Sequence, residues 1–241
     1  MRTVAIVQAR LGSQRLPGKV LKDLCGRPLL DHVVERLRRA KRLDEVVLAI
    51  PDDKRDDVLA IFCEQRRYPV FRGPEGDVLA RYAQTARAFR ADVVVRITSD
   101  CPLIDAELVD TIVERHAMAR INDYTCNVLV RTFPRGLDTE VLSMDCLRRL
   151  DREALKNQYR EHVTTLIHDD PQAFKTENVS RPQGDRSDLR LCVDTPDDFA
   201  LVESVLTALG PHGGVEEVIA FLDKNPAIAS LNANVKQKTT K

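Results

Sequence analysis

The sequence contains no apolar run close to the ~20 residues that a membrane-spanning helix needs. Its 37 basic and 37 acidic residues cancel, which argues against a general nucleic-acid-binding protein. The chain start does not look like a signal peptide, because Arg2 precedes an apolar run too short for one. We therefore expect a cytoplasmic protein that binds neither membrane nor nucleic acid.

The sequence also lacks the clustered cysteines that a zinc site or a disulfide framework requires. Its six cysteines are scattered, and none stands in a C-x-x-C pair. We predict reduced, mostly buried thiols, with Cys101 and Cys192 acting as small apolar core residues.

Strand-like and helix-like runs alternate through the first half of the 241-residue chain. Predicted strands cover residues 4–7, 45–51, 68–72 and 91–98, and predicted helices cover 28–37, 52–67 and 77–90, with Asp52 as a helix cap. This alternation is typical of βαβ units. We predict an α/β fold: one open, mostly parallel, Rossmann-like sheet with helices on both faces.

The second half is less regular. We predict helices at 105–119, 143–155, 157–168, 196–209 and 215–222, extended segments within 122–141, and strands at 173–179 and 190–193. Residues 1–234 would form one domain, and 235–241 a disordered polar tail.

A loop rich in glycine and cations follows the first predicted strand. It carries Arg10, Arg15 and Lys19, with Gly12 and Gly18 between them. Glycines let a backbone approach an anion closely, and the cations bring positive charge to it. The loop has five residues between its glycines and Val20 after Lys19, so it is not a Walker A motif, and it lacks the third glycine of G-x-G-x-x-G. We interpret it as a different phosphate site.

Two aspartates, Asp100 and Asp194, each follow an apolar strand-like run. In open α/β sheets the carboxyl ends of the strands line the ligand crevice. Asp105 is better placed than Asp100 to cap the helix that follows, so we favour a functional role for Asp100. For Asp194, capping of the next helix by Asp194 or Thr195 is an equal alternative.

The run Q-A-R-L-G-S-Q-R-L-P-G-K-V-L resembles the signature loop of the CMP-sugar synthetases, the cytidylyltransferases that activate 3-deoxy-octulosonate and acylneuraminate sugars. The closest branch is that of spore-coat polysaccharide biosynthesis. Further matching runs are R-G-P-E-G-D-V-L-A-R-Y (72–82), R-I-T-S-D-C-P-L-I-D (96–105), G-L-D-T-E-V (136–141), R-E-H-V-T (160–164) and V-D-T-P-D-D (193–198).

The resemblance implies a set of site residues. Nucleotide binding falls to Ala9, Arg10, Gly12, Ser13, Arg15, Lys19, Gly73, Asp77 and Arg81, catalysis to Arg10, Lys19 and Asp100, and Mg²⁺ binding to Asp100 and Asp194. Substrate contacts fall to Arg135, Asp138, Glu140 and His162. The spore-coat branch has an acidic residue in place of Arg135 and Val in place of Thr139. Both departures lie in the implied sugar-binding region.

The implied function is Mg²⁺-dependent transfer of CMP from CTP to an acidic sugar by a homodimeric enzyme, with release of pyrophosphate, for surface polysaccharide synthesis. A nucleotide-sugar-dependent glycosyltransferase is one alternative, although the D-x-D tripeptide common in those enzymes does not occur here. A non-catalytic nucleotide- or sugar-binding protein is the other, and it would have no use for two strand-end aspartates facing a cationic loop.

Overall fold

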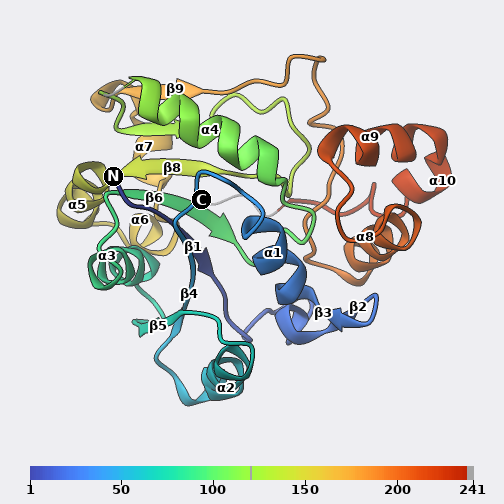
Figure 1. The fold of residues 1–241 in the computed structure, drawn as a ribbon, viewed down its shortest axis with the longest axis horizontal. Helices are drawn as coiled ribbons and strands as arrows, with labels where there is room; N and C mark the ends of the chain where they lie inside the picture. The colour runs from blue at the N-terminus through green and yellow to red at the C-terminus, as the bar shows by residue number, and fades with distance from the viewer. Residues whose placement is uncertain (120, 238–241) are drawn as a thin grey trace.

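The protein is built around a seven-stranded sheet of order β5-β4-β1-β6-β8-β7-β9, in a computed structural model that describes residues 1–119 and 121–237 (Figure 1). The predicted α/β class and mostly parallel sheet are confirmed, because β1, β4, β5 and β6 are mutually parallel. β8 runs antiparallel to both β6 and β7, and β9 is parallel to β7.

The strands of this sheet are β1 (Thr3–Gln8), β4 (Glu45–Pro51), β5 (Val70–Gly73), β6 (Val93–Thr98), β7 (Tyr124–Cys126), β8 (Glu140–Ser143) and β9 (Thr176–Asn178). A separate two-stranded hairpin joins β2 (Asp23–Leu24) and β3 (Arg27–Pro28). The longer helices are α1 (Leu29–Leu37), α2 (Asp57–Gln65), α3 (Val78–Ala88), α4 (Ala106–Ala119), α5 (Met144–Glu153), α8 (Pro196–Leu209) and α9 (Val215–Lys224). Shorter turns of helix are η1 (Lys19–Leu21), η2 (Lys54–Asp56), α6 (Asn157–Glu161), α7 (Thr165–Asp169), η3 (Pro171–Ala173) and α10 (Pro226–Ala229).

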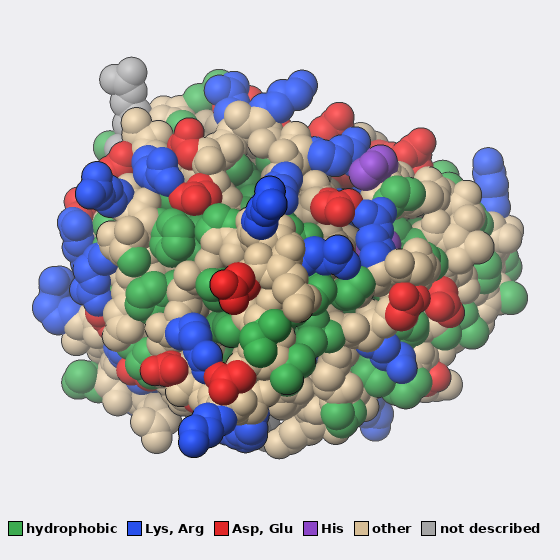
Figure 2. All heavy atoms as spheres, turned by 60° about the horizontal axis from the view of Figure 1, so that its bottom comes forward, with side chains coloured by type: hydrophobic (Ala, Val, Ile, Leu, Met, Phe, Trp, Pro, Cys, Tyr) green, Lys and Arg blue, Asp and Glu red, His purple; other side chains and the backbone are tan. Residues whose placement is uncertain are grey.

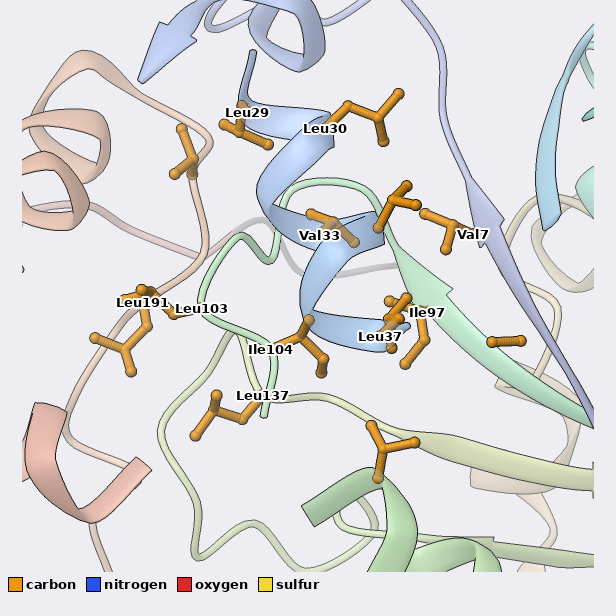
Figure 3. Close-up of a cluster of buried hydrophobic side chains, with 14 of the residues drawn as sticks. Val7, Leu29, Leu30, Val33, Leu37, Ile97, Leu103, Ile104, Leu137 and Leu191 are labelled. Carbon is orange, nitrogen blue, oxygen red and sulfur yellow. The ribbon is translucent and has the colours of Figure 1, made fainter. Parts of the chain in front are cut away.

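Two hydrophobic clusters cover the two faces of the sheet. Alternate residues of β1 divide between them, with Val7 on one face and Ile6 on the other, as the period of a strand requires. The Val7 face packs against α1, where Leu30 and Val33 are fully buried (Figure 3). α2, α4, α8 and α9 complete that layer, while α3, α5 and α7 cover the Ile6 face. Helices therefore lie on both faces, as predicted.

The strand predicted at residues 190–193 is wrong. Arg190 forms only an isolated bridge with Arg135, and the Val193 N–H donates to the Asp100 carbonyl. Residues 190–193 thus contact two different loops, one at Arg135 and one at Asp100, instead of pairing along one strand. Their apolar side chains are buried by these contacts, which explains why the pattern alone resembled a strand.

The single helix predicted at 157–168 is interrupted. It forms α6 and α7, separated by a break at His162–Thr164 where Val163 has a φ of 22°. A positive φ is unfavourable for a β-branched residue. Val163 is nonetheless fully buried in the cluster on the Ile6 face, so tertiary packing stabilises the break.

The predicted capping residues give mixed outcomes. Asp52 is not a helix cap, because Asp53 accepts the N–H of Arg55 at the start of η2. Asp105 does cap α4, where it accepts the N–H of Leu108 at 2.8 Å. Thr195 caps α8 in a capping box with Asp198, so that Asp194 is not needed for this role.

All six cysteines are free thiols, and five are buried, as predicted. None of the helices in the described part of the chain is long and apolar enough to cross a membrane. Basic and acidic side chains are interspersed over the face shown in Figure 2, in keeping with the zero formal charge. Of the predicted tail, residues 238–241 lie outside the described residues, whereas Gln237 accepts a hydrogen bond from Arg190.

Candidate functional site

A cavity of about 840 Å³ opens at the carboxyl ends of β1 and β6. Parallel strands end at the same edge of a sheet, so the loops that follow them meet there. Thirteen of the sequence-predicted site residues line the cavity: Ala9, Arg10, Gly12, Ser13, Arg15, Lys19, Arg81, Asp100, Arg135, Asp138, Glu140, His162 and Asp194.

The cationic loop is held in a compact turn. The Gly18 N–H donates to the Leu11 carbonyl at 3.2 Å, and the Leu11 N–H donates to Asp56 Oδ1 at 2.7 Å. Gly18 has a φ of 67°, the left-handed conformation that glycine adopts without steric cost, and η1 begins at the next residue. This turn directs the buried side chain of Lys19 toward the two strand-end aspartates.

The Lys19 ammonium lies between the two predicted metal ligands. Its Nζ is 3.0 Å from Asp100 Oδ2, 2.9 Å from Asp194 Oδ1 and 2.7 Å from the Val193 carbonyl oxygen. These three acceptors use all three donor hydrogens of the ammonium. Burial alone would lower the pKa of Lys19, but the two carboxylates raise it above its ordinary value. Lys19 is thus a charged bridge between Asp100 and Asp194.

Asp194 is surrounded by cations. Besides Lys19, the Arg15 Nη2 lies 2.8 Å and the Arg190 Nη2 2.7 Å from its Oδ2. Burial alone would raise the pKa of Asp194, but Lys19, Arg15 and Arg190 lower it below its ordinary value. Asp194 therefore carries its negative charge at neutral pH.

Arg190 and the fully buried Asp198 hold Asp194 in position. Arg190 Nε donates to Asp198 Oδ1 at 2.8 Å, and Asp198 Oδ2 accepts the backbone N–H of Asp194 at 2.9 Å. Asn232 completes the network by donating to Asp198 Oδ1 at 2.8 Å and to the Arg190 carbonyl at 2.9 Å. No sequence motif marks Arg190, although Asp194 lies four and Asp198 eight residues further along the chain.

A second buried ion pair closes one wall of the cavity. Arg96 of β6 and Glu140 of β8 are directly opposite in the antiparallel ladder, and their side chains form a salt bridge. Tyr124 donates to Glu140 Oε2 at 2.7 Å. Burial would raise the pKa of Glu140, but Arg96 and, less strongly, His168 lower it. Arg96 begins one of the matching sequence runs, but no role could be predicted for it because its register with Glu140 cannot be read from the sequence.

Three further cavity residues differ in what they already bind. Arg81 is buried and its Nη1 donates to the Pro74 and Glu75 carbonyls, while its Nε has no hydrogen-bond partner among the described residues. The exposed Arg10 has no salt-bridge partner among residues 1–119 and 121–237. His162 lies at the break between α6 and α7, where burial, together with Arg96 and Arg10, lowers the pKa of its imidazole.

The loop before β8 brings Arg135 and Asp138 to the wall of the cavity. Asp138 receives two hydrogen bonds from Arg131, at 2.6 and 2.7 Å. Gly136 has a φ of 102°, and a Cβ there would lie 2.5 Å from the Cys192 backbone nitrogen. Only glycine fits where this loop crosses the segment that leads to Asp194.

Two predicted nucleotide-binding residues do not line the cavity. Gly73 is buried at the end of β5, packed against Arg81. Asp77 caps α3 by accepting the Ala80 N–H at 2.8 Å and is clamped by Arg160 at 2.7–2.9 Å. Asp77 therefore stabilises the start of α3, the helix that carries Arg81.

The donor set at Asp100 and Asp194 suits a divalent metal only together with substrate oxygens. No group of three or more His, Cys, Asp or Glu residues that could hold a metal occurs in residues 1–119 and 121–237. Mg²⁺ typically takes one or two carboxylates and completes its shell with substrate phosphate oxygens and water. Asp100 and Asp194 supply the two carboxylates of that pattern, and Lys19 contacts one oxygen of each.

The chain matches known proteins over nearly its whole length. A family model described as cytidylyltransferase matches residues 4–228. The chain is 35% identical over 233 residues to the spore coat polysaccharide biosynthesis protein SpsF of Bacillus subtilis, covering 93% of this chain and 95% of that protein. A cytidylyltransferase structure from Leptospira borgpetersenii superposes with a TM-score of 0.90 at 30% identity, covering 99% and 100% of the two chains.

A more distant structure shares the fold. It is a CMP:2-keto-3-deoxy-manno-octonic acid synthetase complexed with CTP, with a TM-score of 0.64 at 18% identity, covering 86% of this chain and 99% of that one.

Proposed function

This chain belongs to the cytidylyltransferase family, and from that premise we propose that it transfers CMP from CTP to an acidic sugar, with release of pyrophosphate. SpsF, named for spore coat polysaccharide biosynthesis, supports a product used in surface polysaccharide. The CTP-bound synthetase of the same fold supports CTP as the donor. An acceptor of the ulosonic or nonulosonic acid type follows from the sequence resemblance.

One observation carries the proposal: a single cavity of about 840 Å³ contains the cations of the first loop and both strand-end carboxylates. The reaction joins a sugar hydroxyl oxygen to the α-phosphorus of CTP and breaks the bond from that phosphorus to the bridging oxygen of pyrophosphate. Such a displacement needs alignment of the reactants and neutralisation of phosphate charge. The cavity supplies both.

The cations of the loop have separate roles. Arg10, which has no salt-bridge partner among the described residues, binds the triphosphate directly. Arg15 leaves Asp194 to contact a phosphate oxygen, because a more highly charged anion is then within its reach. Lys19 stays buried beside the reaction centre and balances charge on the departing pyrophosphate.

Asp100 and Asp194 hold Mg²⁺ in this proposal. When bound, Mg²⁺ would neutralise the α-phosphate oxygens and lower the pKa of the attacking hydroxyl. Lys19 contacts an oxygen of each aspartate, so the ammonium and a metal ion compete for the same ligands. We infer that the metal enters with the triphosphate, whose oxygens complete its shell.

The acceptor sugar lies against the β8 side of the cavity. Arg135 faces the cavity and is suited to the carboxylate of an acidic sugar. Arg96 and Glu140 form a rigid, buried wall. Burial keeps the imidazole of His162 neutral near pH 7, so that it can exchange hydrogen bonds with sugar hydroxyls.

Pyrophosphate release tests the function. The purified protein is assayed with each of the four nucleoside triphosphates, with and without Mg²⁺, against a panel of acidic sugars and their reduced, uncharged counterparts. We expect release only with CTP, Mg²⁺ and an acidic sugar. Release that is independent of the nucleobase, or a preference for the uncharged sugars, would refute the assignment.

We also propose that the protein is a homodimer that pairs through residues 122–141, the segment that resembles the pairing region of the CMP-sugar synthetases. Val130 in this segment is 62% exposed in the single chain. An apolar side chain that a partner subunit covers is expected to be exposed in this way when the partner is absent. Light scattering at micromolar concentration tests this, and a monomer contradicts it.

A further inference from the structure

Residues 230–237, the C-terminal segment, follow α10 and reach the cavity described above. They lie beyond residues 4–228, the part of the chain that the family model matches. A turn, in which the Asn232 carbonyl accepts the Val235 N–H at 3.0 Å, precedes Gln237, and Gln237 lines the cavity wall. A segment outside the matched region therefore contributes to the site.

Asn232 makes the buried contact of this segment. Only 5% of the residue is exposed. Its Nδ2 donates to Asp198 Oδ1 at 2.8 Å and to the Arg190 carbonyl at 2.9 Å, so both hydrogens of the amide are used. Asn232 thereby fixes the backbone of Arg190 and the carboxylate of Asp198 relative to each other.

The guanidinium of Arg190 is shared unequally between two carboxylates. Its Nε and Nη2 lie 2.8 and 3.3 Å from the two oxygens of Asp198, whereas only Nη2 contacts Asp194, at 2.7 Å. Its Nη1 donates to Gln237 Oε1. Arginine commonly forms two parallel hydrogen bonds with a single carboxylate. Here Asn232 and Gln237 hold the guanidinium so that Asp198 receives the paired bonds and Asp194 receives one.

This division leaves Asp194 with room for a metal ion. An ionised carboxylate has about four lone-pair sites on its two oxygens. Arg15 and Arg190 each donate to Asp194 Oδ2, and Lys19 donates to Oδ1, so one site remains on Oδ1. A second hydrogen bond from Arg190 would fill that site and strengthen an ion pair that a metal ion has to replace. Asp194 is therefore open to a metal while Arg190 is held on Asp198.

We propose that Asn232 is a positioning residue for the metal-binding carboxylate. By holding Arg190 on Asp198 it keeps Asp194 available to a divalent cation, and Gln237 maintains the same orientation of Arg190 from the cavity wall. The inference rests on the proposed function, in which Asp194 binds Mg²⁺. Residues that orient metal ligands from behind typically change metal affinity about 10- to 100-fold when they are replaced.

Electron paramagnetic resonance tests this role by measuring Mn²⁺ binding to the full chain without nucleotide. We expect Asn232→Ala to weaken Mn²⁺ binding at least about tenfold. The Mg²⁺ concentration that gives half-maximal pyrophosphate release should rise as well, while KM for CTP at saturating Mg²⁺ stays unchanged. Asn225→Ala is the matched control, because Asn225 Nδ2 also donates to a carbonyl, that of Phe221 at 2.8 Å, and Asn225 does not line the cavity.

A purely structural role for Asn232 would give a different result. Asn232→Ala would then unfold at a lower temperature than the wild type, but the folded variant would bind Mn²⁺ with unchanged affinity, and the proposal would be overturned. If Asn232→Ala does not fold, Gln237→Ala provides the test, because Gln237 is exposed. Loss of its hydrogen bond to Arg190 should weaken Mn²⁺ binding at least about threefold, and wild-type affinity in this variant would also overturn the proposal.

Asp194→Asn separates failure of this inference from failure of the proposed function. If Asp194→Asn binds Mn²⁺ like the wild type, the assignment of the metal to Asp194 is wrong, and a positioning role for Asn232 is refuted with it. If Asp194→Asn weakens Mn²⁺ binding and Asn232→Ala does not, the metal assignment stands and only the role of Asn232 is refuted.

Discussion

Lys19 Nζ lies 2.9 Å from Asp194 Oδ1, although 175 positions separate the two residues in the sequence. The same ammonium also contacts Asp100, so that one cation joins the loop after β1, the loop after β6 and the segment before α8. The charge balance of the proposed reaction centre depends on this contact.

Replacing Lys19 with Met tests its role as a competing cation. We expect Mn²⁺ to bind more tightly without nucleotide, because the two carboxylates lose their side-chain partner. Triphosphate binding should weaken and kcat should fall by about 100-fold, the effect typical of removing one charge-stabilising group. Electron paramagnetic resonance measures free Mn²⁺. Lys22→Met, at an exposed site beside Phe199, is the control. Unchanged Mn²⁺ affinity in Lys19→Met would contradict the competition.

Asp194→Asn keeps the shape of the side chain and removes its charge. We expect turnover to be lost and the Mg²⁺ requirement to rise, while metal-free CTP binding is maintained or improved because repulsion of the phosphates is gone. Asp100→Asn should behave alike. Titration calorimetry and pyrophosphate release measure the two effects, with Asp197→Asn, at an exposed position in the first turn of α8, as the control. If Asp194→Asn turns over like the wild type at limiting Mg²⁺, Asp194 is not a metal ligand and Asp100 alone holds the metal.

Asp77→Asn distinguishes helix positioning from nucleotide contact. Loss of the charged pair with Arg160 should lower the free energy of unfolding by about 1 kcal/mol, a value reduced for solvent screening of this partly exposed pair. Because Asp77 does not line the cavity, KM for CTP should stay unchanged. Urea denaturation and steady-state kinetics measure both quantities. A raised KM without loss of stability would instead favour the nucleotide-binding role predicted from the sequence.

Gly136→Ala tests the loop crossing beside Arg135. The added Cβ would meet backbone atoms of Leu191 and Cys192, and the φ of 102° is strained for alanine. We expect a loss of more than about 1 kcal/mol in unfolding free energy by urea denaturation. Gly12→Ala is the matched control, because a Cβ at Gly12 meets no atom within 4 Å. Equal stability of the two variants would show that the crossing is not tight.

Stability should fall in acid. Burial alone would raise the pKa values of Asp194, Asp198 and Glu140, but neighbouring cations lower them below the ordinary 3.8 for Asp and 4.5 for Glu. The unfolded carboxyls therefore take up protons at a higher pH than the folded ones. Their contribution is complete above those ordinary values and is lost as the pH falls through the folded pKa values. Urea midpoints should be constant near about pH 6 and decline below about pH 4. A midpoint that rises in acid would contradict this sign.

The order of strands and helices in the first half could be predicted because each element carries its own periodicity. Asp100 could be placed for the same reason, since it follows the apolar run of β6. The partners of these residues could not be predicted. Arg96 meets Glu140 only through the β6–β8 register, and the Arg190–Asp198 pair depends on the turn into α8 at the capping box of Thr195 and Asp198. The break at Val163 likewise results from burial, which local sequence does not encode.

The reversal of direction at β8 has a consequence for how such proteins diversify. In the proposed function, the parallel strands β1 and β6 carry the half of the cavity that binds the nucleotide, whereas the loop that enters β8 from the opposite direction carries Arg135 and Asp138. The two halves are encoded by separate stretches of sequence that meet at one edge of the sheet. Exchange of residues 127–139 between relatives should therefore change the acceptor sugar while the chemistry of the donor is inherited intact.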